Sequence, residues 1–269
     1  MSQDLAGFAE ATCGTKPTAV TRFAGGDISG ASLIEFADGS KVVGKTGPVV
    51  AVEARMLEAM GASTAPVPKV IGFDERNLLI EHLPSDGMLA GKTWVSLTQA
   101  LDGLHSLRGD AYGWQEDYAL RQVIVENGIT ENWPKFWGER RLLCHVPHIA
   151  ADLGRRIEEL AGRLPDMLPA SPTPSLLHGD LWGGNVLVSG ERISGLIDPC
   201  AYYGDREVDV ASLTVLDTPT PDFFDALDLE SGWRNRLPVY RLWMWLLHVR
   251  LFGESYRPAV ERELAALGF

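Results

Sequence analysis

The chain has 269 residues, 45% of them hydrophobic and 22% charged, and its 36 Asp and Glu against 24 Lys and Arg give a net charge of -12. This length and composition suit one large domain or two packed lobes, and they exclude wholesale disorder. The acidic balance argues against a nucleic-acid partner or an anionic membrane partner, because both usually require a basic surface. It leaves room for an anionic ligand such as ATP, which a lysine, backbone amides and metal ions can hold locally.

The cysteines and the apolar segments indicate the compartment. Three dispersed cysteines, Cys13, Cys144 and Cys200, are too few for a disulfide framework or a zinc site and are expected to be free thiols. The first residues lack a basic region followed by an apolar run, which is the pattern of a secretory signal. The most apolar stretch, 240–252, is too short and too charged to span a bilayer. We therefore expect a cytoplasmic protein; the sequence does not indicate its oligomeric state.

The first eighty residues are predicted to form strands with one helix between them. Residues 32–36 and 41–45 are short β-type runs separated by a hairpin-like turn at 37–40. Apolar residues from Val52 to Met60 recur at helical spacing and predict a helix that ends near Gly61. Another apolar run, 77–83, reads as a further strand.

Beyond Pro84 the pattern becomes mainly helical. Apolar stripes at helical spacing lie within 94–107, 149–164 and 242–249, and short β-type runs occupy 185–188 and 193–198. The predicted class is α+β, with a small antiparallel β-rich N-terminal lobe at 1–83 and a larger, mainly helical lobe at 84–269.

The segment His178-Gly-Asp-Leu-Trp-Gly-Gly-Asn185, followed by Ile197-Asp198-Pro199, carries the strongest chemical signal. It matches the H-x-D-x-x-x-x-N pattern of kinase catalytic loops, in which an aspartate orients the attacking hydroxyl and oxygen ligands hold Mg²⁺. Asp180 is then the general base, and Asn185 and Asp198 are the metal ligands. A surface turn could use the same residues singly, but the ordered set favours the kinase reading. For His178 we prefer a structural role that supports the loop.

The kinase reading also requires a lysine for the nucleotide phosphates, paired with a helix glutamate. Lys45 ends the 41–45 strand and Glu53 lies on the next helix, so this pair is preferred. Lys41, on the same face of the strand, is the competing candidate.

Two further segments are predicted to contact the nucleotide, but the sequence supports them less strongly. Gly25 and Gly26, in a glycine loop before the first strand, could cover phosphates with backbone amides, although a plain turn fits equally well. Glu81, His82 and Leu83 lie where the two lobes meet, and their backbone is expected to meet an adenine ring. This second assignment rests on position alone.

Longer segments extend the likeness beyond a generic kinase. LLHGDLWGGNVL (176–187), LIDPCAYYGDREVDVA (196–211) and LLHVRLFGESY (246–256) resemble the fructosamine (ketosamine) kinase family, within the aminoglycoside phosphotransferase-like and choline-kinase-like group. The resemblance implies a two-lobed protein-kinase-like fold and phosphorylation of a ketosamine sugar hydroxyl with ATP and Mg²⁺. It also implies that the phosphorylated adduct becomes unstable and releases the amine. The partner would be a small-molecule ketosamine or a glycated protein lysine.

The resemblance also suggests an acceptor site. Trp182 would line the substrate side near the base, although a packed aromatic is an equal alternative. The segment after the metal aspartate would shape the acceptor site through Tyr202, Tyr203 and Asp205. For the adjacent Arg206 and Glu207, local salt bridging is an equally good interpretation.

Two rival functions remain at this point. The first is a kinase of the same fold that acts on an aminoglycoside, choline or a free sugar. The second is a non-catalytic, pseudokinase-like binding module, which the complete lysine, base and ligand set disfavours.

The acidic residues are unevenly distributed. Residues 198–230 hold nine acids and one base, a balance of -8 out of -12. Such a stretch would suit Mg²⁺ and a cationic amine acceptor, while a solvated acidic surface is the safer reading from Asp217 onward.

Overall fold

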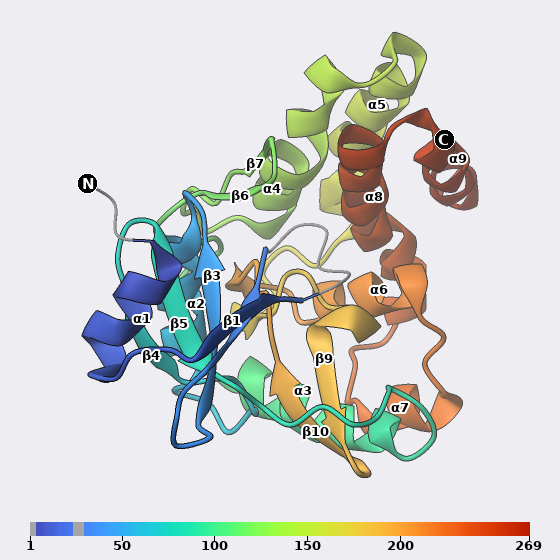
Figure 1. Cartoon of the computed structure of the whole chain (residues 1–269). Coiled ribbons are helices and arrows are strands. Elements are labelled where there is room, and N and C mark those ends of the chain that lie inside the picture. The colour runs from blue at the N-terminus through green and yellow to red at the C-terminus, as the bar shows by residue number, and fades with distance from the viewer. Residues whose placement is uncertain (1–3, 24–29) are drawn as a thin grey trace.

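A computed structural model describes residues 4–23 and 30–269 and has two lobes (Figure 1). The N-terminal lobe is built on an antiparallel five-stranded sheet with strand order β1-β2-β3-β5-β4. Its strands are β1 (Ala19–Arg22), β2 (Ser32–Glu35), β3 (Lys41–Thr46), β4 (Val70–Phe73) and β5 (Asn77–Glu81). Together with the helices of the other lobe, this sheet confirms the predicted α+β class.

The predicted hairpin between β2 and β3 is confirmed. Its turn is closed by Gly39, which takes a positive φ of 84° and donates its N–H to the Phe36 carbonyl. Asp38 Oδ1 accepts from the N–H and the hydroxyl of Ser40 at 2.9 and 2.6 Å. The short polar side chains that predicted the turn therefore satisfy its backbone.

Two helices cover opposite faces of this sheet. Helix α1 (Leu5–Cys13) packs on Val42 and Leu79. Helix α2 (Val50–Met60) packs on the residues next to these in the strands, such as Leu78. Successive strand residues point to opposite faces, which explains the division. The predicted helix is thus confirmed, with its end at Gly61.

Helix α2 belongs to two hydrophobic clusters. Its Val50, Ala54 and Leu57 face the sheet, whereas Met56 and Met60 join the main core of the C-terminal lobe. The helix is therefore held by both parts of the molecule. The proposed boundary at residue 83 stays a prediction.

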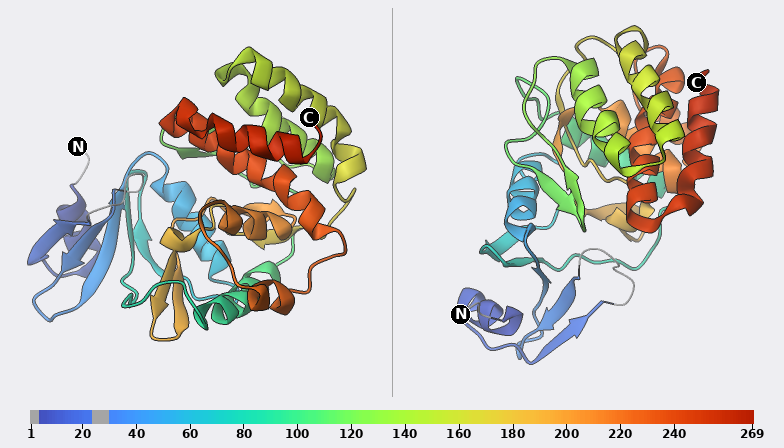
Figure 2. Two further views of the ribbon diagram at one scale, coloured as in Figure 1. Left: turned by 90° about the vertical axis from the view of Figure 1, so that its right-hand side faces the viewer. Right: turned by 90° about the horizontal axis from the view of Figure 1, so that it is seen from above.

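The C-terminal lobe is mainly helical and contains the three predicted helices (Figure 2). Its α-helices are α3 (Thr93–His105), α4 (Trp133–Trp137), α5 (Ala151–Met167), α6 (Glu207–Leu216), α7 (Pro221–Ala226), α8 (Trp233–Phe252) and α9 (Arg257–Ala266). Shorter helical turns are η1 (Gly138–Leu142), η2 (Leu143–His148), η3 (Gly183–Asn185) and η4 (Glu254–Tyr256). Within 4–23 and 30–269, no helix combines the length and apolar character needed to cross a membrane.

Three two-stranded ribbons complete this lobe, and two of them are formed by strands next to or within the predicted catalytic segment 178–199. The ribbons are β6 (Tyr118–Leu120) with β7 (Val123–Val125), β8 (Ser175–Leu177) with β11 (Tyr202–Gly204), and β9 (Val186–Ser189) with β10 (Arg192–Leu196). Strand β8 ends immediately before the H-x-D motif, and β11 begins just after the Ile-Asp-Pro motif. The pairing of Leu177 with Tyr202 therefore brings the two motifs together.

A buried histidine in η2 is expected to make the fold sensitive to acid. Burial, together with the charges of Arg250, Arg141 and His148, lowers the pKa of His145 to about 3. Because this folded-state pKa lies below its ordinary value, His145 favours the folded state above about pH 6.5 and loses that contribution as the pH falls toward 3. One such proton corresponds to a slope of about 1.4 kcal/mol per pH unit in the free energy of unfolding.

We expect His145→Gln to reduce this slope between pH 6.5 and 5. The measurement is urea unfolding at several pH values, with the exposed His82→Gln as the matched control. Equal slopes for the wild type and His145→Gln would contradict the expectation.

Candidate active site

The predicted catalytic loop folds around Asp180. Asn185 donates its Nδ2 to the Asp180 carbonyl at 2.7 Å and to Asp180 Oδ2 at 3.3 Å. Burial, followed by the nearby Asp198 charge, raises the pKa of Asp180 to about 7. A carboxylate with this pKa suits proton acceptance near neutral pH.

His178 holds the backbone of this loop. Its Nε2 lies 2.8 Å from the Ile197 carbonyl, and its Nδ1 lies 3.3 Å from the Asp180 N–H. Donation from Nε2 leaves Nδ1 to accept, so a neutral ring satisfies both contacts. Burial also lowers the pKa of His178, which favours this neutral form. The geometry thus agrees with the structural role preferred from the sequence.

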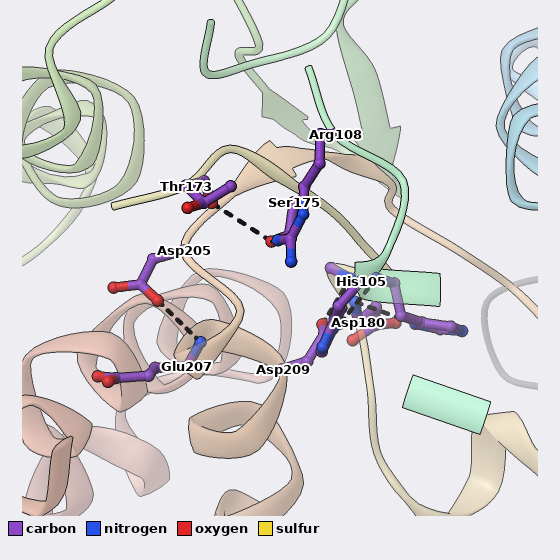
Figure 3. A network of polar contacts seen from close by, with 10 residues as sticks. His105, Arg108, Thr173, Ser175, Asp180, Asp205, Glu207 and Asp209 are labelled. Atoms are coloured by element: carbon purple, nitrogen blue, oxygen red, sulfur yellow. Dashed lines mark hydrogen bonds and ion pairs between the residues drawn. The ribbon is translucent and has the colours of Figure 1, made fainter. Parts of the chain in front are cut away.

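A buried carboxylate beneath the loop accepts three hydrogen bonds (Figure 3). Asp209 of α6 accepts from the N–H groups of His178 and Gly179, each at 2.9 Å, and its Oδ2 lies 2.9 Å from Nε2 of His105 on α3. Burial alone would raise the pKa of Asp209, but these donors and the neighbouring histidines, His105 and His178, lower it. Asp209 therefore ties the start of the catalytic loop to two helices.

Gly179 permits the close approach of the two motif segments. Its φ is 78°, and a Cβ at this position would lie 2.0 Å from the Cys200 carbonyl oxygen. The neighbouring His178 carbonyl accepts from the Cys200 N–H at 2.9 Å. Glycine is required here by both conformation and space.

The predicted lysine and glutamate meet beside the five-stranded sheet of the N-terminal lobe. Lys45 forms a buried ion pair with Glu53 of α2 and a partly buried one with Asp198. Burial would lower the pKa of Lys45, but the two carboxylates raise it and keep the ammonium charged. The competing Lys41 instead pairs with Glu35 at 2.7 Å on the surface. The structure thus brings Lys45 together with the catalytic segment.

The predicted metal ligands offer oxygen atoms that suit Mg²⁺. Asn185 uses its amide nitrogen inside the loop, which leaves Oδ1 as its acceptor atom. The Ile197 N–H donates to the Asn185 carbonyl at 3.0 Å, and Asp198 is 28% exposed. In the described part of the chain, no group of three or more His, Cys, Asp or Glu forms a metal site. Two protein ligands fit Mg²⁺, which usually keeps waters and substrate phosphates as its other ligands.

Trp182 lies on the surface of the loop and is 38% exposed. Its ring packs over Gly184, where an added Cβ would lie 2.2 Å from the indole. The adjacent Gly183 N–H donates to Asp217 Oδ2 at 2.7 Å, so Asp217 also supports this loop. The exposed indole is free to touch a ligand, and its contact with an acceptor stays a prediction.

The other predicted acceptor residues lie deeper than expected. Tyr202 is fully buried against the Arg141 guanidinium, and Asp205 is buried with its carboxylate accepting from the Tyr240 hydroxyl at 2.7 Å. Tyr202 and Asp205 therefore have little exposed surface, and their part in shaping the acceptor site stays a prediction. Tyr203 is half-buried and stacks on Trp114, with ring centroids 6.1 Å apart.

Most carboxylates in the first half of the acidic 198–230 stretch are engaged internally. Glu207 forms a buried ion pair with Arg236, which supports the salt-bridge interpretation for this residue. Asp217 binds the catalytic loop rather than forming part of a solvated acidic surface. The exposed acids begin later, at Asp222, Asp225, Asp228 and Glu230.

The remaining nucleotide assignments are not decided by the geometry. Gly25 and Gly26 lie outside the described residues. Glu81 ends β5, and its N–H donates to the Lys69 carbonyl at 2.9 Å. His82 is exposed and Leu83 is half-buried in the connection to α3. Their contacts with adenine stay predictions.

Sequence reasoning missed two side chains at the centre of the site. Asp209 stands in the quoted 196–211 segment, but nothing local indicated that it would hold the loop. Tyr118 of β6 is buried near Glu53, which lies 65 positions away in the sequence. No spacing pattern links these partners, so only the tertiary fold shows their contacts.

Comparison with known proteins indicates the family of the chain. The profile of the fructosamine kinase family matches residues 1–267. A probable ketoamine kinase of Enterococcus faecium is 34% identical over 182 residues, which are 62% of this chain and 65% of that protein. A Thermobifida fusca structure assigned as a fructosamine-3-kinase superposes with a TM-score of 0.90 at 27% identity and covers 99% of both chains.

A more distant structure shares the fold. A thermostable mutant of aminoglycoside phosphotransferase APH(4)-Ia, solved with AMP-PNP and hygromycin B, has a TM-score of 0.66 at 18% identity. The superposition covers 99% of this chain and 96% of the phosphotransferase chain. The two-lobed architecture is therefore that of the protein-kinase-like phosphotransferases, and the chain belongs to the fructosamine kinase family.

Proposed function

We propose that this protein transfers the γ-phosphoryl group of ATP to a sugar hydroxyl of a ketosamine. The observation that carries the proposal is the convergence of Asp180, Asn185, Asp198 and Lys45 in one site. These are the base, the oxygen ligands and the phosphate-binding cation that phosphoryl transfer requires. Family membership supports the acceptor class.

In this mechanism Asp180 orients the acceptor hydroxyl and takes its proton as the hydroxyl oxygen bonds to the γ-phosphorus. The bond between that phosphorus and the β–γ bridging oxygen breaks, and ADP leaves with the electron pair. Lys45 exchanges its contact with Asp198 for phosphate oxygens, while Glu53 keeps the ammonium in place. Asn185 holds Asp180 through Nδ2.

Asn185 and Asp198 would hold Mg²⁺, which when bound neutralises phosphate charge. Removal of divalent metal with a chelator is accordingly expected to abolish turnover, and added Mg²⁺ is expected to restore it.

The proposed product is a ketosamine phosphate, which is unstable and releases the amine. The reaction then serves deglycation, and the acceptor is a free ketosamine or a glycated protein lysine. The exposed Trp182 beside the base offers an apolar surface for the sugar.

The substrate proposal is tested by steady-state turnover with Mg²⁺ and ATP against fructose-lysine, ribulose-lysine, an aminoglycoside and choline. We expect turnover of one or both ketosamines with the highest kcat/KM. Turnover confined to the aminoglycoside or choline would contradict the proposed acceptor and leave the phosphoryl-transfer mechanism intact. An absence of turnover with every acceptor would favour the non-catalytic alternative.

A further inference from the structure

Helix α6 supports the catalytic loop at two places, and the second support lies apart from the buried network around Asp209. Asp209, in the first turn of the helix, accepts from two N–H groups at the start of the loop. Asp217 follows the last residue of α6, and its Oδ2 accepts from the Gly183 N–H at 2.7 Å. The two carboxylates thus hold the loop on both sides of Asp180 along the chain.

The position of Asp217 is unfavourable for the helix itself. The C-terminal end of a helix carries partial negative charge, so a carboxylate there lowers the stability of the helix. Asp217 is the C-cap of α6, and its N–H donates to the Leu213 carbonyl at 3.1 Å, while its carboxylate contacts the loop. Helix stability therefore does not account for an acid at this position, whereas the hydrogen bond from Gly183 does.

Gly183 leaves the space that this carboxylate occupies. An added Cβ at Gly183 would lie 2.5 Å from Asp217 Oδ1, 3.3 Å from Cγ and 3.4 Å from Oδ2. Apart from atoms of the adjacent residues, these are the three nearest heavy atoms. Gly183 does not have a positive φ, so its backbone conformation does not itself require glycine. The missing side chain is needed because of the Asp217 carboxylate.

The segment held in this way carries Trp182 on the exposed side of the loop. The Asn185 N–H donates to the Trp182 carbonyl at 2.9 Å, which closes the short turn around Gly183. Asn185 is also held through its Nδ2, which donates to the Asp180 carbonyl at 2.7 Å. Trp182 is 38% exposed, and its ring lies over Gly184. Movement of Gly183 would therefore displace the indole more than the predicted metal ligand.

We propose that Asp217 is a positioning residue that fixes the backbone of Gly183 and, through it, the place of the Trp182 indole beside Asp180. This inference rests on the proposed phosphoryl transfer, in which the indole offers an apolar surface to the acceptor sugar. Asp217 acts on the acceptor side of the site. The Lys45–Glu53 pair on the nucleotide side is held by a separate contact.

The first test is Asp217→Ala, with ATP and the better substrate of fructose-lysine and ribulose-lysine varied in turn. Because the Gly183 N–H loses a charged acceptor, kcat/KM for the ketosamine should fall about tenfold, mostly through a higher KM, with the KM for ATP changed less than about twofold. Asp217→Asn keeps an acceptor oxygen and should stay within about threefold of the wild type. Equal losses in Asp217→Asn and Asp217→Ala would show that the charge itself matters and would overturn the inference.

The matched control is Asp74→Ala in the turn between β4 and β5. Asp74 Oδ1 accepts from the N–H groups of Arg76 and Asn77 at 2.8 and 2.7 Å, so the substitution removes the same kind of contact away from the catalytic loop. Its ketosamine KM should stay within about twofold of the wild type. An equal rise in KM in Asp74→Ala and Asp217→Ala would show a general loss of stability and overturn the inference.

A double-mutant cycle tests whether Asp217 acts through Gly183. Gly183→Ala alone should raise the ketosamine KM about as much as Asp217→Ala, because the new methyl group displaces the carboxylate. In the Asp217→Ala background it should add less than about a twofold rise, since the obstructing carboxylate is already absent. A full further rise of about tenfold would show two independent effects and overturn the inference.

Hydrogen exchange separates this inference from the proposed function. Exchange of the amides in 181–187, measured by mass spectrometry, needs neither nucleotide nor acceptor. It should be about tenfold faster in Asp217→Ala than in the wild type and unchanged in Asp74→Ala.

Failure of the wild type to phosphorylate ketosamines would refute the acceptor proposal, and the exchange measurement would still test the contact between Asp217 and Gly183. Unchanged exchange in Asp217→Ala would refute the support of the loop by Asp217. Faster exchange with an unchanged ketosamine KM would refute its effect on the acceptor.

Discussion

Replacement of Asp180 by asparagine is expected to lower kcat for ketosamine phosphorylation about a thousandfold, because the acceptor hydroxyl loses its proton acceptor. The asparagine side chain has nearly the same size as aspartate and remains next to Asn185. Nucleotide binding should change little, since Lys45 and Asp198 remain in place. Initial rates and an ADP titration measure the two effects separately.

The control for this prediction is Asp222→Asn, which removes an exposed carboxylate of α7. It should leave kcat within about twofold of the wild type, as expected for a surface substitution far from any special feature. If Asp180→Asn retained more than a tenth of the wild-type kcat, Asp180 would not be the base.

Asp209→Ala is expected to have the largest effect on stability. The substitution leaves the His178 and Gly179 N–H groups and the His105 ring without their buried acceptor. Breaking a buried charged network by removing one partner costs about 3–5 kcal/mol in the free energy of unfolding. The activity that remains should also fall, because the catalytic loop loses its anchor to α6.

Denaturant unfolding and circular dichroism measure this loss. The stability of Asp209→Asn should lie between those of the wild type and Asp209→Ala. Its amide retains one acceptor oxygen, but the other oxygen is replaced by a donor. Asp225→Ala, which removes an exposed acid, is the control and should unfold near the wild-type midpoint. An Asp209→Ala variant as stable as Asp225→Ala would show that the three hydrogen bonds contribute little.

The parts of the site that could be predicted are those encoded locally. Asp180, Asn185 and His178 lie in one eight-residue segment, so their spacing alone indicated a catalytic loop. Lys45 and Glu53 were found because a strand and the following helix place them eight positions apart. The β2–β3 hairpin was predictable for the same reason, because its turn residues satisfy their own backbone.

The sequence was less informative where distant partners decide the environment of a residue. Tyr202 reads as a polar aromatic beside the motif, yet it lies buried against Arg141 of η1. Asp205 lies close to the motif in the sequence, yet it is buried and its carboxylate accepts a hydrogen bond from Tyr240 of α8. Neither partner shows any local relation to the motif. Side chains near a catalytic segment therefore need the tertiary structure before they can be assigned to a substrate.

The acidic stretch shows the same limit in terms of charge. Counting residues suggested a surface for a cationic amine, but Asp198 and Glu207 form ion pairs with Lys45 and Arg236. Asp209 is buried and holds hydrogen bonds rather than facing a ligand. A local excess of acids thus partly reflects ion pairs with bases elsewhere in the chain. Asp198 remains the member best placed to meet a metal.

Product identification tests the central claim most directly. The purified chain is incubated with Mg²⁺, ATP and fructose-lysine, and the products are separated and identified by mass spectrometry. We predict equal amounts of ADP and of a ketosamine that carries one phosphoryl group on its sugar, with neither formed above background by Asp180→Asn. ADP without a phosphorylated ketosamine, or equal product from Asp180→Asn, would contradict the account.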